Sequence, residues 1–180
     1  MPQSVRRDRP RTAGFQLTAS VLPRPNQRVQ AICDFVHHRI KFGYEHAAPM
    51  RGAIEALVEG RGVCRDFAHL AVALCRCMNI PARYCTGYLG DIGVPPDPTP
   101  MDFSAWFEVY IGGRWYTFDA RHNKPRIGRI LIARGRDAAD VAISTTFGAN
   151  ILKRFVVRTH EVTSEYEPAV RLARAAEANP

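Results

Sequence analysis

One cysteine, Cys64, stands where a thiol is expected to be reactive. It follows the Gly-Arg-Gly-Val segment 60–63 and opens a run of apolar residues at helical spacing. A sulfur in the first turn of a helix lies beside backbone N–H groups without intrahelical partners, at the positive end of the helix dipole. This environment favours the thiolate and supplies donors for an oxyanion. Cys64 is therefore the candidate nucleophile, and Arg65 is expected to add to the positive field.

The other four cysteines lie within apolar helix or strand patterns and are expected to be small buried hydrophobic residues; they are Cys33, Cys75, Cys77 and Cys85. An odd number of cysteines without framework spacing indicates reduced thiols. No fourth ligand completes a zinc pattern. The sequence also has no P-loop, dinucleotide-binding or acidic calcium-loop pattern, so no cofactor and no metal is expected.

A β-hairpin is predicted where two aromatic and β-branched runs are separated by Gly112-Gly113, and these runs cover residues 105–111 and 114–119. Counting outward from a two-residue turn places Trp106 opposite Asp119. Ser104 then lies on the same face, one pair further out. Ser104 and Asp119 become diagonal neighbours, with backbones about 7–8 Å apart.

Apolar periodicity and turn residues predict the other elements. Helices are expected over residues 25–42, 53–59, 64–80, 137–143 and 167–178, strands over 82–88 and 152–162, and a proline-rich loop over 93–100. Helices first and antiparallel strands later indicate an α+β fold. We expect a flexible basic arm over residues 1–24, one core domain over 25–165 and a C-terminal helix or tail over 166–180.

Composition narrows the function classes. The 180 residues are 46% hydrophobic, which suits one substantial core. No segment has the apolar length of a membrane span or a secretory signal, so a cytoplasmic protein without membrane association is expected. The net charge of +8 does not indicate nucleic-acid binding, because the arginines are dispersed and no aromatic-basic platform accompanies them.

The stretch GVCRDFAHLAVALCRCMNIPARYCTGY, followed by SAWFEVYIGGRWYTFD, resembles the transglutaminase-like core found in many bacterial proteins. That family has a papain-like fold in which the central helix starts at a cysteine and packs on an antiparallel sheet. A cysteine, a histidine in an HAW-type strand motif and an aspartate ending the next strand form its catalytic triad. The resemblance covers residues 28–122 and implies that Cys64 and Asp119 occupy the cysteine and aspartate positions.

The sequence departs from the family pattern at Ser104, where the histidine is expected. Serine is no general base near neutral pH. His122 is three residues beyond Asp119, and regular alternation would point it to the opposite face of the strand. It reaches the site if the chain bends after the strand, which the following asparagine and proline favour. The candidate site is therefore Cys64, Asp119, Ser104 and His122.

Three residues near the candidate site are not expected to be catalytic. Glu108 is expected to be solvated on the outer part of the hairpin. Asp66 is expected to interact with the helix dipole. The Trp106 side chain either lines the site or packs in the core.

Two functions remain open at this level. The resemblance implies a cysteine enzyme that hydrolyses amide bonds or transfers the acyl group through a thioester, on a peptide or protein substrate, with His122 or a water held by Ser104 carrying the proton. The alternative is a catalytically impaired pseudoenzyme that binds a peptide or protein partner. Because many relatives carry a β-rich region ahead of this core, an oligomer or a partner is also expected to cover exposed apolar surface.

Overall fold

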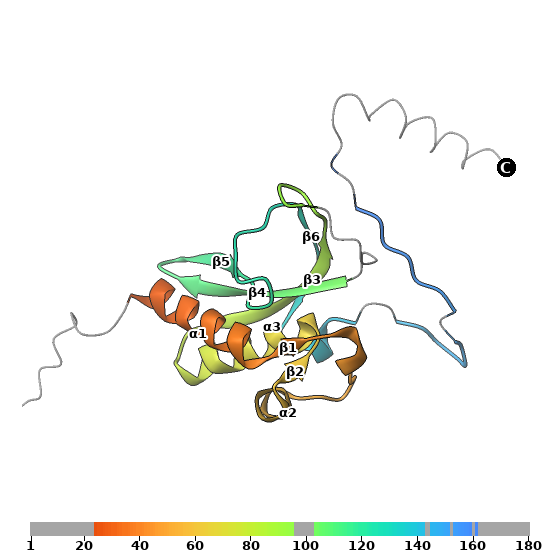
Figure 1. Ribbon diagram of the computed structural model, residues 1–180, viewed down its shortest axis with the longest axis horizontal. Helices are drawn as coiled ribbons and strands as arrows, with labels where there is room; N and C mark the ends of the chain where they lie inside the picture. Colours follow the sequence, from red (N-terminus) through yellow and green to blue (C-terminus); the bar gives the residue numbers. More distant parts are fainter. Residues whose placement is uncertain (1–23, 96–102, 143–144, 152, 160, 162–180) are drawn as a thin grey trace, which may run out of the picture.

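The computed structural model describes residues 24–95, 103–142, 145–151, 153–159 and 161. Helices pack on a four-stranded antiparallel sheet, and a two-stranded parallel ladder lies beside them (Figure 1). The helices are α1 (Pro25–Arg39), α2 (Ala53–Glu59) and α3 (Cys64–Cys77), with the 3-10 turns η1 (Tyr44–His46) and η2 (Ala138–Asp140). The strands are β1 (Lys41–Phe42), β2 (Arg61–Gly62), β3 (Ala82–Leu89), β4 (Phe103–Ile111), β5 (Arg114–Phe118) and β6 (Arg129–Gly135). The α+β fold is confirmed.

The two helices that form most of the core have one-sided apolar stripes. Helix α1 begins with Pro25 in its first turn, where the missing N–H has no partner to lose. Its buried residues recur at helical spacing and are Val29, Ile32, Cys33 and Val36. Helix α3 buries a wider face against α1 and the sheet, and the largest residues of that face are Phe67, Leu70, Val72 and Cys75. The predicted central helix is thus confirmed.

A short segment ahead of α3 fixes where that helix starts. Helix α2 ends at Gly60, whose φ of 64° is a left-handed conformation that glycine adopts without steric cost. The chain then pairs Arg61 and Gly62 in parallel with β1 before Cys64 opens α3. The β1–β2 ladder therefore holds the approach to the cysteine against the end of α1.

The hairpin has the predicted register. Ile111 pairs with Arg114 across Gly112 and Gly113, whose φ values are 57° and 91°. Positive φ at both turn positions is the geometry that a two-residue hairpin requires. The sheet order is β5-β4-β3-β6, so β4 and β3 are its central strands.

Both faces of the central strands are buried over part of their length. The face toward the helices carries Ala105, Phe107 and Val109, and the opposite face carries Ser104 and Trp106. The indole of Trp106 lies against Gly87 on β3, where an added Cβ would come within 3.0 Å of the ring and would overlap the Ile130 carbonyl oxygen. Glycine at position 87 therefore permits the close approach of β4, β3 and β6.

Two of the predicted elements after the hairpin are wrong. The helix predicted over 137–143 is only the three-residue turn η2, since the Asp137 side chain accepts from the Ala139 N–H and Val141 turns into the core. Residues 153–159 form no strand. Instead, β6 pairs with β3, and its β-branched run between Gly128 and Gly135 is the signal that would have located it.

Other predictions fall largely outside the described residues. These are the flexible arm, the C-terminal helix and most of the proline-rich loop. The domain division remains a prediction. Among the described helices, none has the length and apolar character to cross a membrane.

Candidate active site

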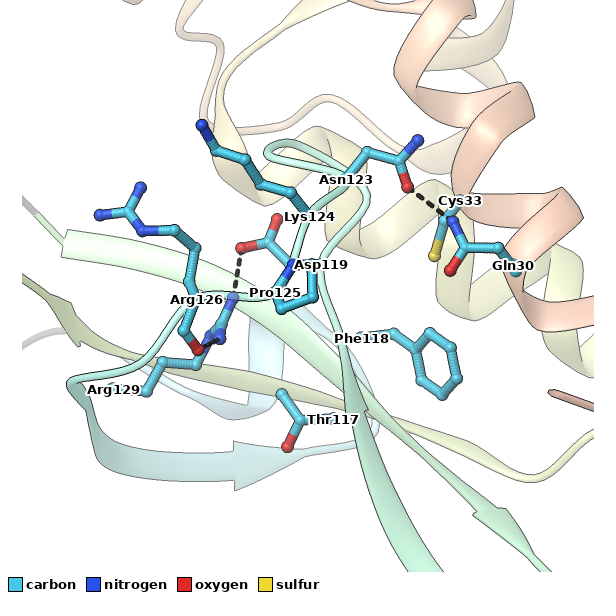
Figure 2. Close-up of a pocket in the computed structure, with 10 residues that line it drawn as sticks. All are labelled: Gln30, Cys33, Thr117, Phe118, Asp119, Asn123, Lys124, Pro125, Arg126 and Arg129. Carbon is cyan, nitrogen blue, oxygen red and sulfur yellow. Dashed lines mark hydrogen bonds and ion pairs between the residues drawn. The ribbon is translucent and has the colours of Figure 1, made fainter. Parts of the chain in front are cut away.

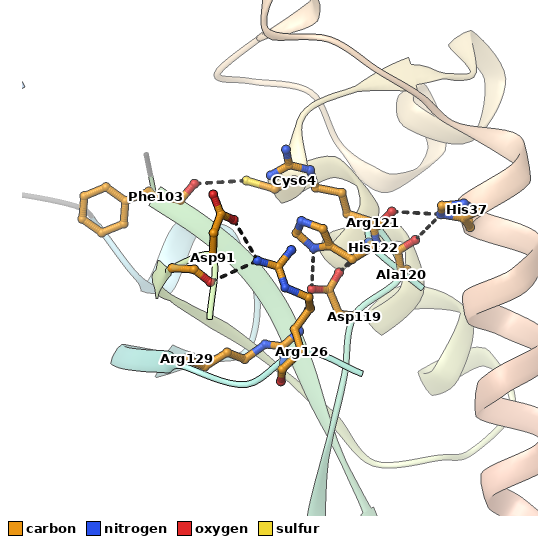
Figure 3. Close-up of polar contacts among 11 residues, drawn as sticks. His37, Cys64, Asp91, Phe103, Asp119, Ala120, Arg121, His122, Arg126 and Arg129 are labelled. Atoms are coloured by element: carbon orange, nitrogen blue, oxygen red, sulfur yellow. Dashed lines mark hydrogen bonds and ion pairs between the residues drawn. The ribbon is translucent and has the colours of Figure 1, made fainter. Parts of the chain in front are cut away.

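Cys64 is the first residue of α3 and is half-buried. Its Sγ lies 3.6 Å from the carbonyl oxygen of Phe103, to which the thiol donates (Figure 3). Phe103 begins β4, so the sulfur lies where the N-terminus of the helix meets the start of this strand. The predicted placement of Cys64 at a helix start is confirmed.

Asp66 fixes the turn that carries Cys64. Its side chain is 1% exposed and accepts hydrogen bonds from the Val63 N–H at 2.8 Å, Arg51 Nη1 at 3.1 Å and Arg65 Nη2 at 2.9 Å. A Cβ at Gly62 would overlap Asp66 Oδ2, so the chain before the helix is in close contact with this carboxylate. Asp66 is therefore a buried ion-pair centre, a stronger role than the interaction with the helix dipole that we expected.

Arg65 also differs from the expectation. Its guanidinium pairs with Asp66 and donates to the carbonyl oxygens of Ala48 and Pro49. These contacts tie the segment after η1 to the first turn of α3. In this structure, Arg65 mainly stabilises the segment that contains Ala48 and Pro49.

Asp119 directly follows β5 and is 7% exposed. Oδ1 accepts from the backbone N–H groups of Arg121 and His122, each at 3.0 Å. Oδ2 accepts from His122 Nδ1 and from Arg129 Nη2, each at 2.8 Å. Burial alone raises the pKa of this carboxyl, but hydrogen bonds and charge from His122, together with the Arg129 charge, outweigh burial and lower the pKa to about 2.

The chain bends immediately after Asp119. The Asp119 carbonyl oxygen accepts from the Asn123 N–H at 2.9 Å, and Asn123 has a φ of 49°. His37 on α1 contacts the carbonyl oxygens of Ala120 and Arg121 through Nδ1, at 3.2 and 2.9 Å. The bend that the sequence required for His122 to approach the site is therefore present, and α1 holds it in place.

His122 carries an oriented imidazole. In Figure 3 the ring lies between the Asp119 carboxylate and Cys64, and Nδ1 faces the carboxylate. Donation from Nδ1 to Asp119 assigns the tautomer in which Nε2 of the neutral ring is a proton acceptor. A histidine in this state has the chemistry of a general base.

Ser104 is the second residue of β4 and is 4% exposed. Its hydroxyl has no hydrogen-bond partner among the described residues, although its carbonyl oxygen accepts from Thr86 Oγ1 at 3.5 Å. The structure thus brings Asp119 and His122 into direct contact, and it buries Ser104, whose hydroxyl contacts no partner in the described part of the chain.

Arg129 was missed by sequence reasoning because the strand that carries it was missed. Besides the ion pair with Asp119, its guanidinium lies 5.6 Å from the ring centre of Trp106. Trp106 is buried, and it packs in the sheet beneath this arginine. The available signal was its position at the start of an apolar, β-branched run directly after Gly128, which indicates a strand.

Two other expectations were wrong. Glu108 is buried in an ion-pair cluster with Arg83 and Arg134, and although burial raises its pKa, hydrogen bonds from both arginines lower it overall. Cys77 is exposed, whereas Cys33, Cys75 and Cys85 are buried as expected. No disulfide joins the five cysteines, all of which lie in the described part of the chain.

Comparison with known proteins identifies the family. A model of the transglutaminase-like superfamily matches residues 13–120, which is more than half of the chain. The chain belongs to the transglutaminase-like superfamily. The match includes Cys64, Ser104 and Asp119 and ends just before His122.

The superfamily assignment agrees with individual relatives. An uncharacterised protein of Mycobacterium leprae is 37% identical over 92 residues, covering 49% of this chain and 33% of the relative. An uncharacterised protein of Mycobacterium tuberculosis is 35% identical over 99 residues, covering 50% and 32%. The chain therefore spans about a third of the length of these curated relatives.

A solved structure shows the same fold. The Cytophaga hutchinsonii protein described as a "putative cysteine protease" is 44% identical, with a TM-score of 0.61. The alignment covers 69% of this chain and 41% of that one. The transglutaminase-like fold, with its central helix starting at Cys64, is thus confirmed.

Within the described residues, no group of three or more His, Cys, Asp and Glu side chains is placed to hold a metal ion.

Proposed function

We propose that this transglutaminase-like protein is a cysteine-dependent enzyme that acts on amide bonds, with Cys64 as the nucleophile. The observation that supports the proposal most is the 2.8 Å hydrogen bond between His122 Nδ1 and Asp119 Oδ2. It supplies an imidazole of fixed orientation although Ser104 occupies the strand position of the family's histidine. His122 thus takes over the general-base role from an adjacent loop.

The first half of the reaction forms a thioester. His122 Nε2 takes the proton of the Cys64 thiol, and the thiolate attacks the carbonyl carbon of the amide. Backbone N–H groups at the start of α3 hold the oxyanion of the tetrahedral intermediate. When the intermediate collapses, the C–N bond breaks, and the His122 imidazolium gives its proton to the leaving amine.

The second half restores the free thiol. His122 takes a proton from water or from an amine, which attacks the thioester carbonyl. The C–S bond breaks, the sulfur receives the proton, and a carboxylic acid or a new amide leaves. Asp119 stays ionised throughout, because its pKa of about 2 lies far below neutral pH, and its charge stabilises the imidazolium.

The alternative is a pseudoenzyme that binds a peptide or protein partner, and Ser104 is the observation that favours it. At that strand position, a buried hydroxyl that has no hydrogen-bond partner among the described residues replaces the proton carrier of the family. A water bound to Ser104 is a further candidate for the proton carrier within the enzyme hypothesis.

Alkylation of Cys64 by iodoacetamide distinguishes these functions, and peptide mass spectrometry reports each cysteine separately. Cys77 is exposed and serves as a control thiol within the same molecule. We expect Cys64 to be alkylated well below the ordinary thiol pKa of about 8.5, and His122→Ala to slow Cys64 but leave Cys77 unchanged. Introducing Ser104→His into the His122→Ala protein is expected to restore the rate.

Equal pH profiles for Cys64 and Cys77 in both proteins would contradict the enzyme hypothesis and favour the binding module. If Cys64 is activated but His122→Ala has no effect, the thiolate is stabilised without this histidine, and the proposed base is wrong. Thermal unfolding of each variant shows whether a lost response reflects a lost fold.

A further inference from the structure

A cavity lies beside Asp119, and Cys64 is not among its described lining residues. It has a volume of about 360 Å³ and is bounded by α1, the end of β5 and the loop that leads to β6 (Figure 2). This volume falls within the range of roughly 300–1,000 Å³ in which small-molecule sites lie. The lining residues are Gln30, Cys33, Thr117, Phe118, Asp119, Asn123, Lys124, Pro125, Arg126 and Arg129.

The polar groups around this cavity are mostly hydrogen-bond donors. Lys124, Arg126 and Arg129 each carry a positive charge, and all three come from one loop and the first residue of β6. Thr117 adds a hydroxyl, whereas the side-chain amides of Gln30 and Asn123 already donate to Asp34. Among the described lining residues, Asp119 alone is acidic.

The acidic residue does not use up the positive charge. Both oxygens of Asp119 already accept from backbone N–H groups, His122 and Arg129. Arg126 pairs with Asp91 at 3.1 Å. Lys124 forms no ion pair within the part of the chain that the structure describes, and its side chain is directed out of the loop in Figure 2. A third carboxylate, Asp34, accepts from the side-chain amides of Gln30 and Asn123. Among the three cations of the cavity, Lys124 is thus the one that no described carboxylate pairs.

The two arginines also retain unused donors. The Nε atoms of Arg126 and Arg129 are buried and have no partner among the described residues. The Arg126 side chain is only 7% exposed. A buried N–H without an acceptor is unfavourable, so this site gains stability from a ligand that supplies one. Guanidinium groups bind the oxygens of phosphates and carboxylates through paired hydrogen bonds.

We propose that this cavity binds the oxyanion group, phosphate or carboxylate, of a small ligand through Lys124, Arg126 and Arg129. Arg129 keeps its contact with Asp119 and adds a second acceptor, while Lys124 supplies a cation that no described carboxylate pairs. The site does not include Cys64 or Ser104, although Asp119 and Arg129 belong to both this cavity and the candidate active site. Anion binding is measured without turnover, so its failure would not count against the proposed reaction.

Thermal unfolding of the 180-residue chain against increasing inorganic phosphate tests the site, with sodium chloride adjusted to keep the ionic strength constant. A ligand that binds only the folded state raises the unfolding temperature in a saturable way. Lys124→Met is expected to weaken phosphate binding by about tenfold, because a hydrogen bond to a charged group is lost. Arg114→Gln removes an exposed charge at the hairpin turn and is expected to leave phosphate binding unchanged.

Succinate, titrated in the same way, identifies the source of the oxyanion. Tighter binding of phosphate indicates a phosphorylated ligand, and tighter binding of succinate indicates a carboxylate ligand. The proposal is overturned if neither anion gives saturable stabilisation, or if Lys124→Met and Arg114→Gln reduce it equally. Arg126→Gln provides a second lining variant, in which binding is also expected to weaken.

Discussion

At the scale of single residues, Asp119 organises the candidate site. Its carboxylate accepts from two backbone N–H groups, one imidazole and one guanidinium, so it shapes the bend and orients His122 at the same time. One carboxylate thus fixes the backbone of the loop that follows it and orients the imidazole in that loop. The same contacts keep the pKa of Asp119 at about 2.

The depressed pKa of Asp119 predicts a specific loss of stability in acid. A carboxyl whose pKa is lower in the folded than in the unfolded state stabilises the fold above its unfolded pKa, and this contribution disappears as the pH falls toward the folded value. From an ordinary value of 3.8 to about 2, the shift corresponds to about 2 kcal/mol.

We therefore expect the free energy of unfolding to fall between about pH 5 and about pH 2 more steeply in the native chain than in Asp119→Asn, by about 2 kcal/mol. Urea unfolding at a series of pH values measures the difference. Parallel pH dependences in the two proteins would show that Asp119 does not titrate as described.

At the scale of elements, the start of α3 is held by a buried ion-pair cluster. Asp66 accepts from Arg51, Arg65 and the Val63 N–H, and Arg51 also donates to the His46 carbonyl oxygen and to Glu59. Residues 46–51, Glu59 and residues 63–66 therefore meet at the N-terminus of α3, where Cys64 lies. The position of the thiol depends on this cluster as much as on the helix itself.

Asp66→Asn is expected to lower the free energy of unfolding by about 3–5 kcal/mol, because the change leaves two arginines facing an uncharged group in a buried cluster. Chemical denaturation measures it. The matched control is Asp140→Asn, which removes a carboxylate from the exposed pair with Arg136 and is expected to have little effect. An equally small effect for Asp66→Asn would show that the cluster is not a stabilising anchor.

At the scale of the whole molecule, the chain presents apolar side chains that the described fold does not cover. Strand β5 is at one edge of the sheet, and Trp115 and Tyr116 on it are exposed, as is Phe35 on α1. The chain spans about a third of the length of the curated relatives it matches. Exposed apolar surface of this kind is typical of an interface.

We predict that the purified 180-residue chain self-associates and that light scattering after size exclusion reports a species larger than its 20.2 kDa mass. Because burial of aromatic surface drives the association, moderate salt is expected to leave the size unchanged. A monomer at all concentrations tested would count against an oligomer that covers this surface.

The sequence by itself determined the features that depend on neighbours in the chain. Cys64 at a helix start, the helix stop at Gly60 and the register across Gly112-Gly113 all follow from local backbone geometry and were predicted correctly. Together with apolar periodicity, they were sufficient for the α+β class, whereas the family resemblance rested on the sequence motifs around Cys64 and Asp119.

Only the tertiary structure decided which distant side chains meet. Arg129 reaches Asp119 because β6 pairs with β3, a long-range pairing that local propensity does not encode. Likewise, the loop of His122 is held by His37 from α1, more than 80 residues earlier in the sequence. Contacts of this kind depend on sheet order and loop direction, which only the packing of the whole chain fixes.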